Sequence, residues 1–301
     1  MPMSRRAFLV LTSLAATGCA PAEDAEHTIR LATGLAGGPY EVLGDRFAAE
    51  LRRDGVAVQV IKTAASVQNL QMLADGRADV GFSLADSADD AVRVRHQPVA
   101  ALARMYMNYV HLVVRHDSAI FEPKDLARRV VSIGAEGSGT AVTAARVLSA
   151  AGLPSAGALR LGLDASILAL REGDVDAFFW SGGVPTPALA ATEGIRLVPL
   201  ESLVPVLRRT YGPVYEPADV PAGVYAGTLP VPTVGTPSYL MCRRDLPEDA
   251  AYTVTDTLFR ARDRLQAPSA PGGRLDKRYA IGTGIVPLHP GAARYYRSVY
   301  G

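Results

Sequence analysis

The stretch that decides the fold reads Thr28-Ile29-Arg30-Leu31-Ala32-Thr33-Gly34-Leu35-Ala36-Gly37-Gly38-Pro39-Tyr40. Residues 28–33 alternate in polarity and predict a strand. Residues 34–39 are rich in glycine and predict a turn. Apolar side chains then recur at helical spacing through residues 40–53, and Gly55 stops the predicted helix. A strand that feeds a helix through a tight turn is the building unit of α/β proteins with a parallel sheet.

The same unit recurs along the chain. The next strands are predicted at residues 56–62 and 78–83, separated by a helix at residues 67–74 with Ser66 as its N-cap. A second series starts with a strand at 130–133, a glycine turn at 136–140 and a helix at 141–151. The other predicted elements are strands at 99–105, 110–115, 159–161, 177–180 and 239–243, helices at 123–126, 166–171, 185–192 and 248–265, a helix opening at Asp86, and a loop-rich tail from Pro268. Two such α/β series predict two hinged lobes with a ligand cleft between them.

Composition excludes several classes of function. The 301 residues include 31 basic and 30 acidic side chains, so the net charge is +1. A nucleic-acid-binding surface would require a basic excess. The five histidines show no zinc-ligand spacing, and neither a metal nor a cofactor is predicted. Cys242 lies in an apolar, strand-like run and is expected to be a buried hydrophobe, because no activating neighbour is visible.

The amino-terminal residues predict export. Arg5 and Arg6 precede a short apolar run at residues 7–16, which is typical of a secretory leader and too short to span a bilayer. The segment from Ser4 to Leu9 resembles a twin-arginine signal, and the segment from Leu14 to Cys19 resembles a bacterial lipobox. We therefore expect a signal peptide at residues 1–18, lipidation of Cys19 and a tether at residues 19–27, with a plain cleaved signal as the alternative.

Three glycine-containing segments are candidates for binding, at residues 33–40, 137–140 and 180–187. Glycine lets the backbone approach a ligand, and the helix that follows offers unpaired N–H groups to an anion. The first segment has neither the dinucleotide-binding spacing nor the P-loop lysine. For each segment a structural role stays open: a tight turn, capping by Ser138, or core filling by Trp180.

No catalytic set is apparent in the sequence. Ser181-Gly182-Gly183 is not a nucleophile elbow, and no Asp and His follow it in plausible company. Glu136 and Asp164 have no partner in sequence. The chain is therefore predicted not to be an enzyme.

Several segments, in this order, resemble the TAXI family of substrate-binding proteins, which serve TRAP-type transporters. The similarity extends from about Ile29 to about Tyr296. It rests on residues 33–44, 62–70, 73–81, 109–114, 137–140, 176–188, 221–225, 233–235 and 287–292. The resemblance implies a two-lobed periplasmic binding protein-like (type II) fold. It also implies closure on a small organic anion, a dicarboxylate or a glutamate-like amino acid, and docking on a membrane permease.

The resemblance also implies lobes and site residues. Lobe 1 would comprise residues 28–111 plus 239–301, and lobe 2 residues 112–238. The family commonly has a Thr-Gly-Gly-Ser-like turn where this chain has residues 63–66, and Thr or Tyr in place of Pro39. The ligand-binding residues carried over by position are Gly37, Gly38, Tyr40, Ser66, Asn69, Asp86, Ser138, Gly139, Thr140, Trp180, Gly182, Pro185 and Tyr225.

We interpret the two glycine turns, one per lobe, as donors of N–H groups and hydroxyls to a carboxylate. Trp180 and Tyr40 would pack on the apolar part of the ligand. Arg104 is a candidate for a bidentate contact with the carboxylate, with an ordinary surface role as its alternative. Two other functions stay open: a ligand-sensing lipoprotein that presents solute to a membrane sensor, and an α/β hydrolase.

Overall fold

The computed structural model describes residues 28–154, 157–225, 229–265 and 275–301. The predicted leader with Arg5 and Arg6, the lipidation site Cys19 and the whole tether at residues 19–27 lie outside these residues. Among the helices in the described ranges, none is long and apolar enough to cross a membrane.

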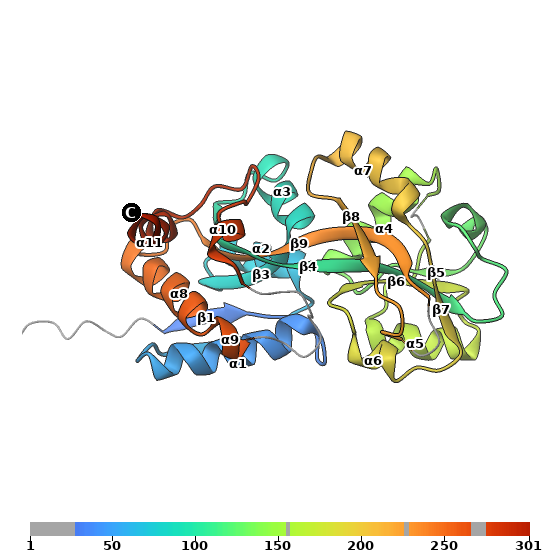
Figure 1. The fold of residues 1–301 in the computed structure, drawn as a ribbon, viewed down its shortest axis with the longest axis horizontal. Coiled ribbons are helices and arrows are strands. Elements are labelled where there is room, and N and C mark those ends of the chain that lie inside the picture. Colours follow the sequence, from blue (N-terminus) through green and yellow to red (C-terminus); the bar gives the residue numbers. More distant parts are fainter. Residues whose placement is uncertain (1–27, 155–156, 226–228, 266–274) are drawn as a thin grey trace, which may run out of the picture.

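The described strands form one mixed sheet that extends through two lobes (Figure 1). Its order is β2-β1-β3-β9-β4-β6-β5, with β7 beside β4 and β8 beside β9. The strands are β1 (Ile29–Ala32), β2 (Val58–Ile61), β3 (Val80–Leu84), β4 (Val99–Arg115), β5 (Val131–Ser132), β6 (Ala177–Gly182), β7 (Ile195–Val198), β8 (Glu216–Val220) and β9 (Val231–Arg243).

Helices cover both faces of the sheet in each lobe. In the first lobe α1, α8, α9 and α11 pack on one face, and α2 and α3 pack on the other. In the second lobe α4 and α7 oppose α5 and α6. The helices are α1 (Pro39–Arg53), α2 (Ser66–Ala74), α3 (Ala85–Arg93), α4 (Gly139–Ala150), α5 (Leu163–Glu172), α6 (Pro187–Ala190), α7 (Val204–Tyr211), α8 (Glu248–Arg260), α9 (Arg262–Leu265), α10 (Lys277–Ala280) and α11 (Pro290–Tyr300).

The first helix shows how the sequence specifies these elements. Pro39 occupies the first helical position, where its fixed φ suits a helix and its missing N–H costs no bond. Leu43, Phe47 and Leu51 follow at intervals of four and are buried in the core of the first lobe. Gly55 then adopts a φ of +82°, a left-handed conformation that ends the helical segment.

Two long antiparallel strands, β4 and β9, join the lobes (Figure 1). Val99 of β4 pairs with Arg243 in the first lobe, and Tyr109 pairs with Gly235 in the second. The register shifts between Arg104 and Met107, in the middle of the connection. A bulge of this kind bends a strand without ending its pairing.

The two-lobe α/β prediction is confirmed, and the strands of the strand–helix repeats are parallel as expected, although the sheet as a whole is mixed. Strands β1, β2 and β3 are parallel, as are β5 and β6, whereas β9 lies antiparallel between β3 and β4. The reason is topological: β4 leaves the first lobe, and β9 returns to it alongside. For the same reason the separate strands predicted at 99–105 and 110–115 are one strand, and the strand predicted at 239–243 already begins at Val231.

Other boundaries also differ from the prediction. The N-cap of α2 is Ala65, not Ser66, because the Ser66 hydroxyl oxygen accepts the N–H of Leu84 instead, at 3.0 Å. Ala65 has a φ of +85°, a region that favours glycine, so this alanine stands in a strained conformation. The strand predicted at 159–161 is a single bridge from Leu159 to Ser132.

The carboxyl-terminal part is more helical than predicted. The helix predicted at 248–265 is divided into α8 and α9 by Ala261. The tail predicted as loop contains α11, which begins where His289 Nδ1 accepts the N–H of Gly291. Pro290 and Gly291 at its start are turn-like in sequence, but α11 is stabilised by packing, with the Tyr295 ring stacked on Phe259 of α8 at 5.6 Å.

Candidate functional site

A small cavity lies between the two lobes. Its volume is about 40 Å³, several times what one water molecule requires. It lies where β1, β3 and β6 end, as expected for α/β sheets, in which ligands bind beyond the carboxyl ends of the strands. Its lining residues are Gly34, Leu35, Gly38, Pro39, Tyr40, Ala64, Ala65, Ser66, Leu84, Asn108, Ser138, Gly139, Thr140, Trp180 and Ser181.

Four helices begin at this cavity. The first residues of α1, α2 and α4 line it, and so does Leu84, the N-cap of α3. Each helix of this length presents partial positive charge at its amino end. No charged side chain lines the cavity within the described ranges. Its electrostatic potential therefore comes from backbone dipoles, which favour an anion.

The second glycine turn keeps its donors available. The Ser138 hydroxyl oxygen accepts the N–H of Ala141 at 3.1 Å, and the Thr140 oxygen accepts the N–H of Ser181 at 3.3 Å. Each hydroxyl proton therefore remains able to donate to a ligand. The N–H groups of Gly139 and Thr140 lie in the first turn of α4, where no intrahelical acceptor exists. The oxygen of Ser181 is buried and has no hydrogen-bond partner among the residues that the structure describes.

The first glycine turn offers fewer N–H groups to a ligand than the second, although Ser138 in the second turn likewise donates its N–H to the carbonyl of Ala135 at 3.1 Å. The N–H of Gly37 donates to the carboxylate of Glu41, which also pairs with Lys62, and the N–H of Gly38 donates to the carbonyl of Leu35. Pro39 has no N–H to offer. The two turns therefore differ in the donors that they offer, and the interpretation that both present N–H groups to a carboxylate stays a prediction.

A polar floor closes one side of the cavity. The Tyr40 hydroxyl lies 2.8 Å from Ser238 Oγ, and the amide of Asn108 donates to the same oxygen. Burial raises the pKa of Tyr40 well above its ordinary value, and burial also raises that of Tyr106 nearby. Both phenols therefore stay neutral.

Trp180 lines one wall of the cavity but does not donate a hydrogen bond into it. Its indole N–H donates to Thr186 Oγ1 at 2.9 Å, so it is unavailable to a ligand. The ring folds back over Gly182, where an added Cβ would lie 2.5 Å from the indole nitrogen. Gly182 therefore leaves room for the Trp180 ring and does not itself line the cavity.

Tyr225 and His111 support this wall from behind. The N–H of Thr186 donates to the Tyr225 hydroxyl at 3.1 Å, and that hydroxyl lies 2.8 Å from His111 Nε2. Burial lowers the pKa of His111 to about 4, so the ring is neutral. Since Nδ1 lies 2.9 Å from the carbonyl of Tyr109, we assign the ring proton to Nδ1, and Nε2 accepts from Tyr225.

The lobes contact each other around the cavity. The N–H groups of Val67 and Gln68 at the start of α2 both donate to the carbonyl of Gly137, at 3.1 Å each. A Cβ on Gly139 would lie 2.4 Å from Ser66 Oγ in the opposite lobe. The structure is thus a closed form, and Gly139 allows the close approach.

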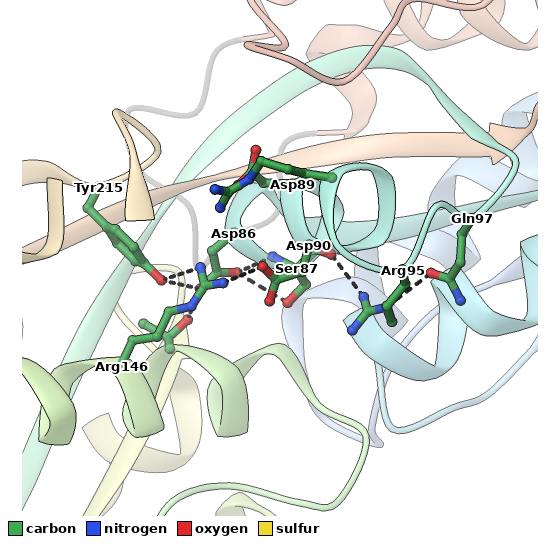
Figure 2. A network of polar contacts seen from close by, with 10 residues as sticks. Asp86, Ser87, Asp89, Asp90, Arg95, Gln97, Arg146 and Tyr215 are labelled. Atoms are coloured by element: carbon green, nitrogen blue, oxygen red, sulfur yellow. Dashed lines mark hydrogen bonds and ion pairs between the residues drawn. The ribbon is translucent and has the colours of Figure 1, made fainter. Parts of the chain in front are cut away.

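A buried polar network, which we call the α3–α4 network, joins the lobes beside the cavity (Figure 2). The Asp86 carboxylate accepts from Tyr215 at 2.9 Å and from Thr143 at 2.6 Å. Arg146 donates to the Tyr215 hydroxyl at 3.1 Å and pairs with Asp90 at 2.6 Å. Burial, followed by the charge of Asp86, raises the pKa of Tyr215, so its phenol remains a donor. Asp86 therefore holds the lobes together and does not line the cavity.

The structure brings seven of the thirteen predicted residues to the cavity: Gly38, Tyr40, Ser66, Ser138, Gly139, Thr140 and Trp180. The other six lie outside its lining: Gly37, Asn69, Asp86, Gly182, Pro185 and Tyr225. Asn69 is fully buried and donates to the carbonyls of Thr33 and Phe82, which ties strand ends together. Arg104 pairs with Glu216 at 2.9 Å and does not reach the cavity.

Residues that the prediction omitted also line the cavity, among them Asn108 and Ser181. Asn108 carries a visible signal, a polar residue within a mostly apolar strand region. Ser181 lies in the candidate binding segment at residues 180–187, but it is not among the site residues carried over from the family resemblance. Leu35 and Leu84 are aliphatic, so nothing in the sequence separates them from core residues.

The mixed sheet, the two lobes and the cavity at the strand ends define a class, the two-lobe type II periplasmic binding protein fold. The chain belongs to the NMT1-like family, whose model matches residues 31–299.

Solved structures share this fold at low identity. CAE31940 from Bordetella bronchiseptica RB50 is 18% identical with a TM-score of 0.56, covering 90% of this chain and 89% of that one. PhnD1 from Prochlorococcus marinus (MIT 9301), solved with methylphosphonate, is 14% identical with a TM-score of 0.55, covering 80% and 86%. The effector-binding domain of a BenM variant is 10% identical with a TM-score of 0.51, covering 79% and 95%.

Proposed function

We propose that this chain is the extracytoplasmic solute-binding subunit of a TRAP-type secondary transporter of the TAXI kind. It binds a small organic anion between its lobes and delivers it to the membrane permease. The observation that carries the proposal is the convergence of four helix starts on an interlobe cavity whose described lining residues include no charged side chain. The resemblance to the TAXI family nominates dicarboxylates and glutamate-like amino acids as ligands.

Binding and closure are coupled in this proposal. The anion contacts α1 and α2 from one lobe and α4 from the other, so only the closed form offers the full set of contacts. A ligand that binds one conformation better shifts the population toward it. The permease then distinguishes the closed form from the open one. The lobes are residues 28–111 plus 239–301 and residues 112–238, moving about β4 and β9.

The protein is proposed to work outside the cytoplasm, attached to the membrane. The leader directs the chain out of the cytoplasm, and lipidated Cys19 anchors it at the membrane surface. The tether then keeps the binding domain at high local concentration beside its permease.

Titration calorimetry on the chain without its leader tests the binding claim. The panel contains succinate, glutamate, propionate and butyrate, together with uncharged amides of the same size. We expect saturable binding of at least one anion and none of the amides. Failure of every anion to bind would refute the proposed function. Deleting the gene should also abolish uptake of the bound anion, and restoring it should recover uptake.

A sensing role is the second candidate, since an effector-binding domain shares the fold. In that case the permease genes would be absent beside this gene and a membrane sensor would replace them. If the gene-deletion strain takes up the anion normally but no longer shows a transcriptional response to it, sensing would be favoured. The hydrolase alternative needs a base near Ser138, and no carboxylate or imidazole lines the cavity in the described part of the chain. Ester turnover abolished by Ser138→Ala would revive it.

A further inference from the structure

The donors of the cavity are gathered at one end. Thr140 Oγ1 and the N–H of Ser181 lie 3.3 Å apart, and Ser138, the cap of α4, precedes them on the same helix. The hydroxyls of Ser138 and Thr140 accept backbone N–H groups, which leaves their protons to donate. The buried oxygen of Ser181 has no partner within the described residues. One carboxylate, with two oxygens, matches this cluster.

Ser66 belongs to the same end of the cavity, since its hydroxyl accepts the N–H of Leu84 and lies against Gly139. The wall made by Trp180, Pro39, Leu35 and Leu84 offers no donor to a second charge. Trp180 has its N–H bonded to Thr186, Pro39 has none, and Leu35 and Leu84 are aliphatic. A second carboxylate would lie against these groups without donors, which is costly in a buried site.

An ammonium group would be equally isolated. The nearby acidic side chains already have partners: Glu41 pairs with Lys62, and Asp86 accepts from Thr143 and Tyr215. Asn108 is the one lining amide, and it donates to Ser238. A buried cation without a counter-charge is strongly disfavoured.

The cavity is also small. A volume of about 40 Å³ is a few times the roughly 10–15 Å³ that one water occupies by the same measure. The ligand must therefore be compact, with a carboxylate at the α4 end and an apolar remainder against Trp180 and Leu84.

We infer that the ligand is a small monocarboxylate with an uncharged, mainly apolar tail, recognised by the donor cluster of Ser138, Gly139, Thr140 and Ser181. This rests on the proposed function and narrows its ligand class. Dicarboxylates and amino acids bind more weakly because their second charge has no partner.

Calorimetry on the full mature chain compares butyrate, succinate, glutamate and butyramide. Butyrate is expected to bind at least about 10-fold more tightly than each of the others, since an unpaired buried charge costs well over one tenfold step. Tighter binding of succinate or glutamate would overturn the inference and leave the proposed function standing. Binding of butyramide as tight as butyrate, or binding of none of the four, would overturn both.

Ser181→Ala tests the donor cluster directly. Removing a hydrogen bond to a charged group should weaken butyrate binding about 10-fold or more. Ser149→Ala on the exposed side of α4 is the matched control and should leave binding unchanged. Thermal unfolding of both variants separates a loss of contact from a loss of fold. Unchanged affinity of Ser181→Ala, with a normal unfolding temperature, would contradict the assignment of Ser181.

Discussion

At the scale of single residues, His111 links acidity to stability. Its ring is buried and neutral, and its pKa is lowered from 6.5 to about 4 by that burial. The unfolded chain therefore takes up a proton at higher pH than the folded chain does. The stability that comes from the neutral ring is fully present above pH 6.5 and is lost as the pH falls toward 4.

We predict that the free energy of unfolding decreases between pH 7 and pH 4 by about 3 kcal/mol through this group. In His111→Gln that part of the pH dependence should disappear, because glutamine does not titrate. Urea denaturation at several pH values measures the difference between the two proteins. His116→Gln, at an exposed position, is the control and should keep the wild-type slope. Parallel curves for wild type and His111→Gln would show that His111 titrates normally.

At the scale of elements, the α3–α4 network connects helix α3 of the first lobe to helix α4 of the second. Arg146 is nearly buried, pairs with Asp90 and lies over the Tyr211 ring at 4.4 Å. Because this ion pair joins two helices of different lobes, it stabilises the closed form as well as the fold.

Arg146→Met should reduce the free energy of unfolding by about 3 kcal/mol, since it leaves Asp90 without its partner. It should also weaken ligand binding, although Arg146 does not line the cavity, because the closed form loses a contact. Urea denaturation and calorimetry measure the two effects. Arg115→Met removes an exposed ion pair with Asp117 and should change stability by less than about 1 kcal/mol. Equal effects of the two variants would argue against a special role of the network.

At the scale of the whole molecule, the proposed design separates a tether from a binding domain. The lobes form a continuous sheet, and the residues that line the cavity lie between Gly34 and Ser181, whereas Cys19 precedes β1 in the sequence. Anchorage and ligand recognition should therefore be independent.

Cys19→Ala should move the protein from the membrane pellet to the supernatant, because the lipid attachment is lost. Its affinity for the bound anion should match that of the wild-type protein. Cell fractionation and calorimetry test the two statements. Cys242→Ala serves as a control for thiol loss, since this cysteine is buried in the first lobe and cannot carry a lipid. A drop in the affinity of Cys19→Ala would mean that anchor and domain are coupled.

Much of the architecture could be read from local sequence signals. The alternation of residues 28–33, the glycine turns and the helical spacing of Leu43, Phe47 and Leu51 act within a few residues of each other, so the repeated strand–turn–helix units and the two lobes follow from them. The chemistry of the second glycine turn was visible for the same reason, since Ser138 and Thr140 stand at a helix start. Cys242 is buried, as its apolar surroundings indicated.

Only the tertiary structure decided which of these residues meet. Strand β9 returns beside β4, and Asn108 and Ser181 come to the cavity through pairings distant in sequence. Asp86 and Tyr225 are polar residues near the cleft, yet each is satisfied by partners from other elements and lies outside the cavity lining. The physical reason is that a hydrogen bond or a packing contact depends on position in space. Local pattern determines which elements form, whereas the closure of the two lobes determines which donors remain for a ligand.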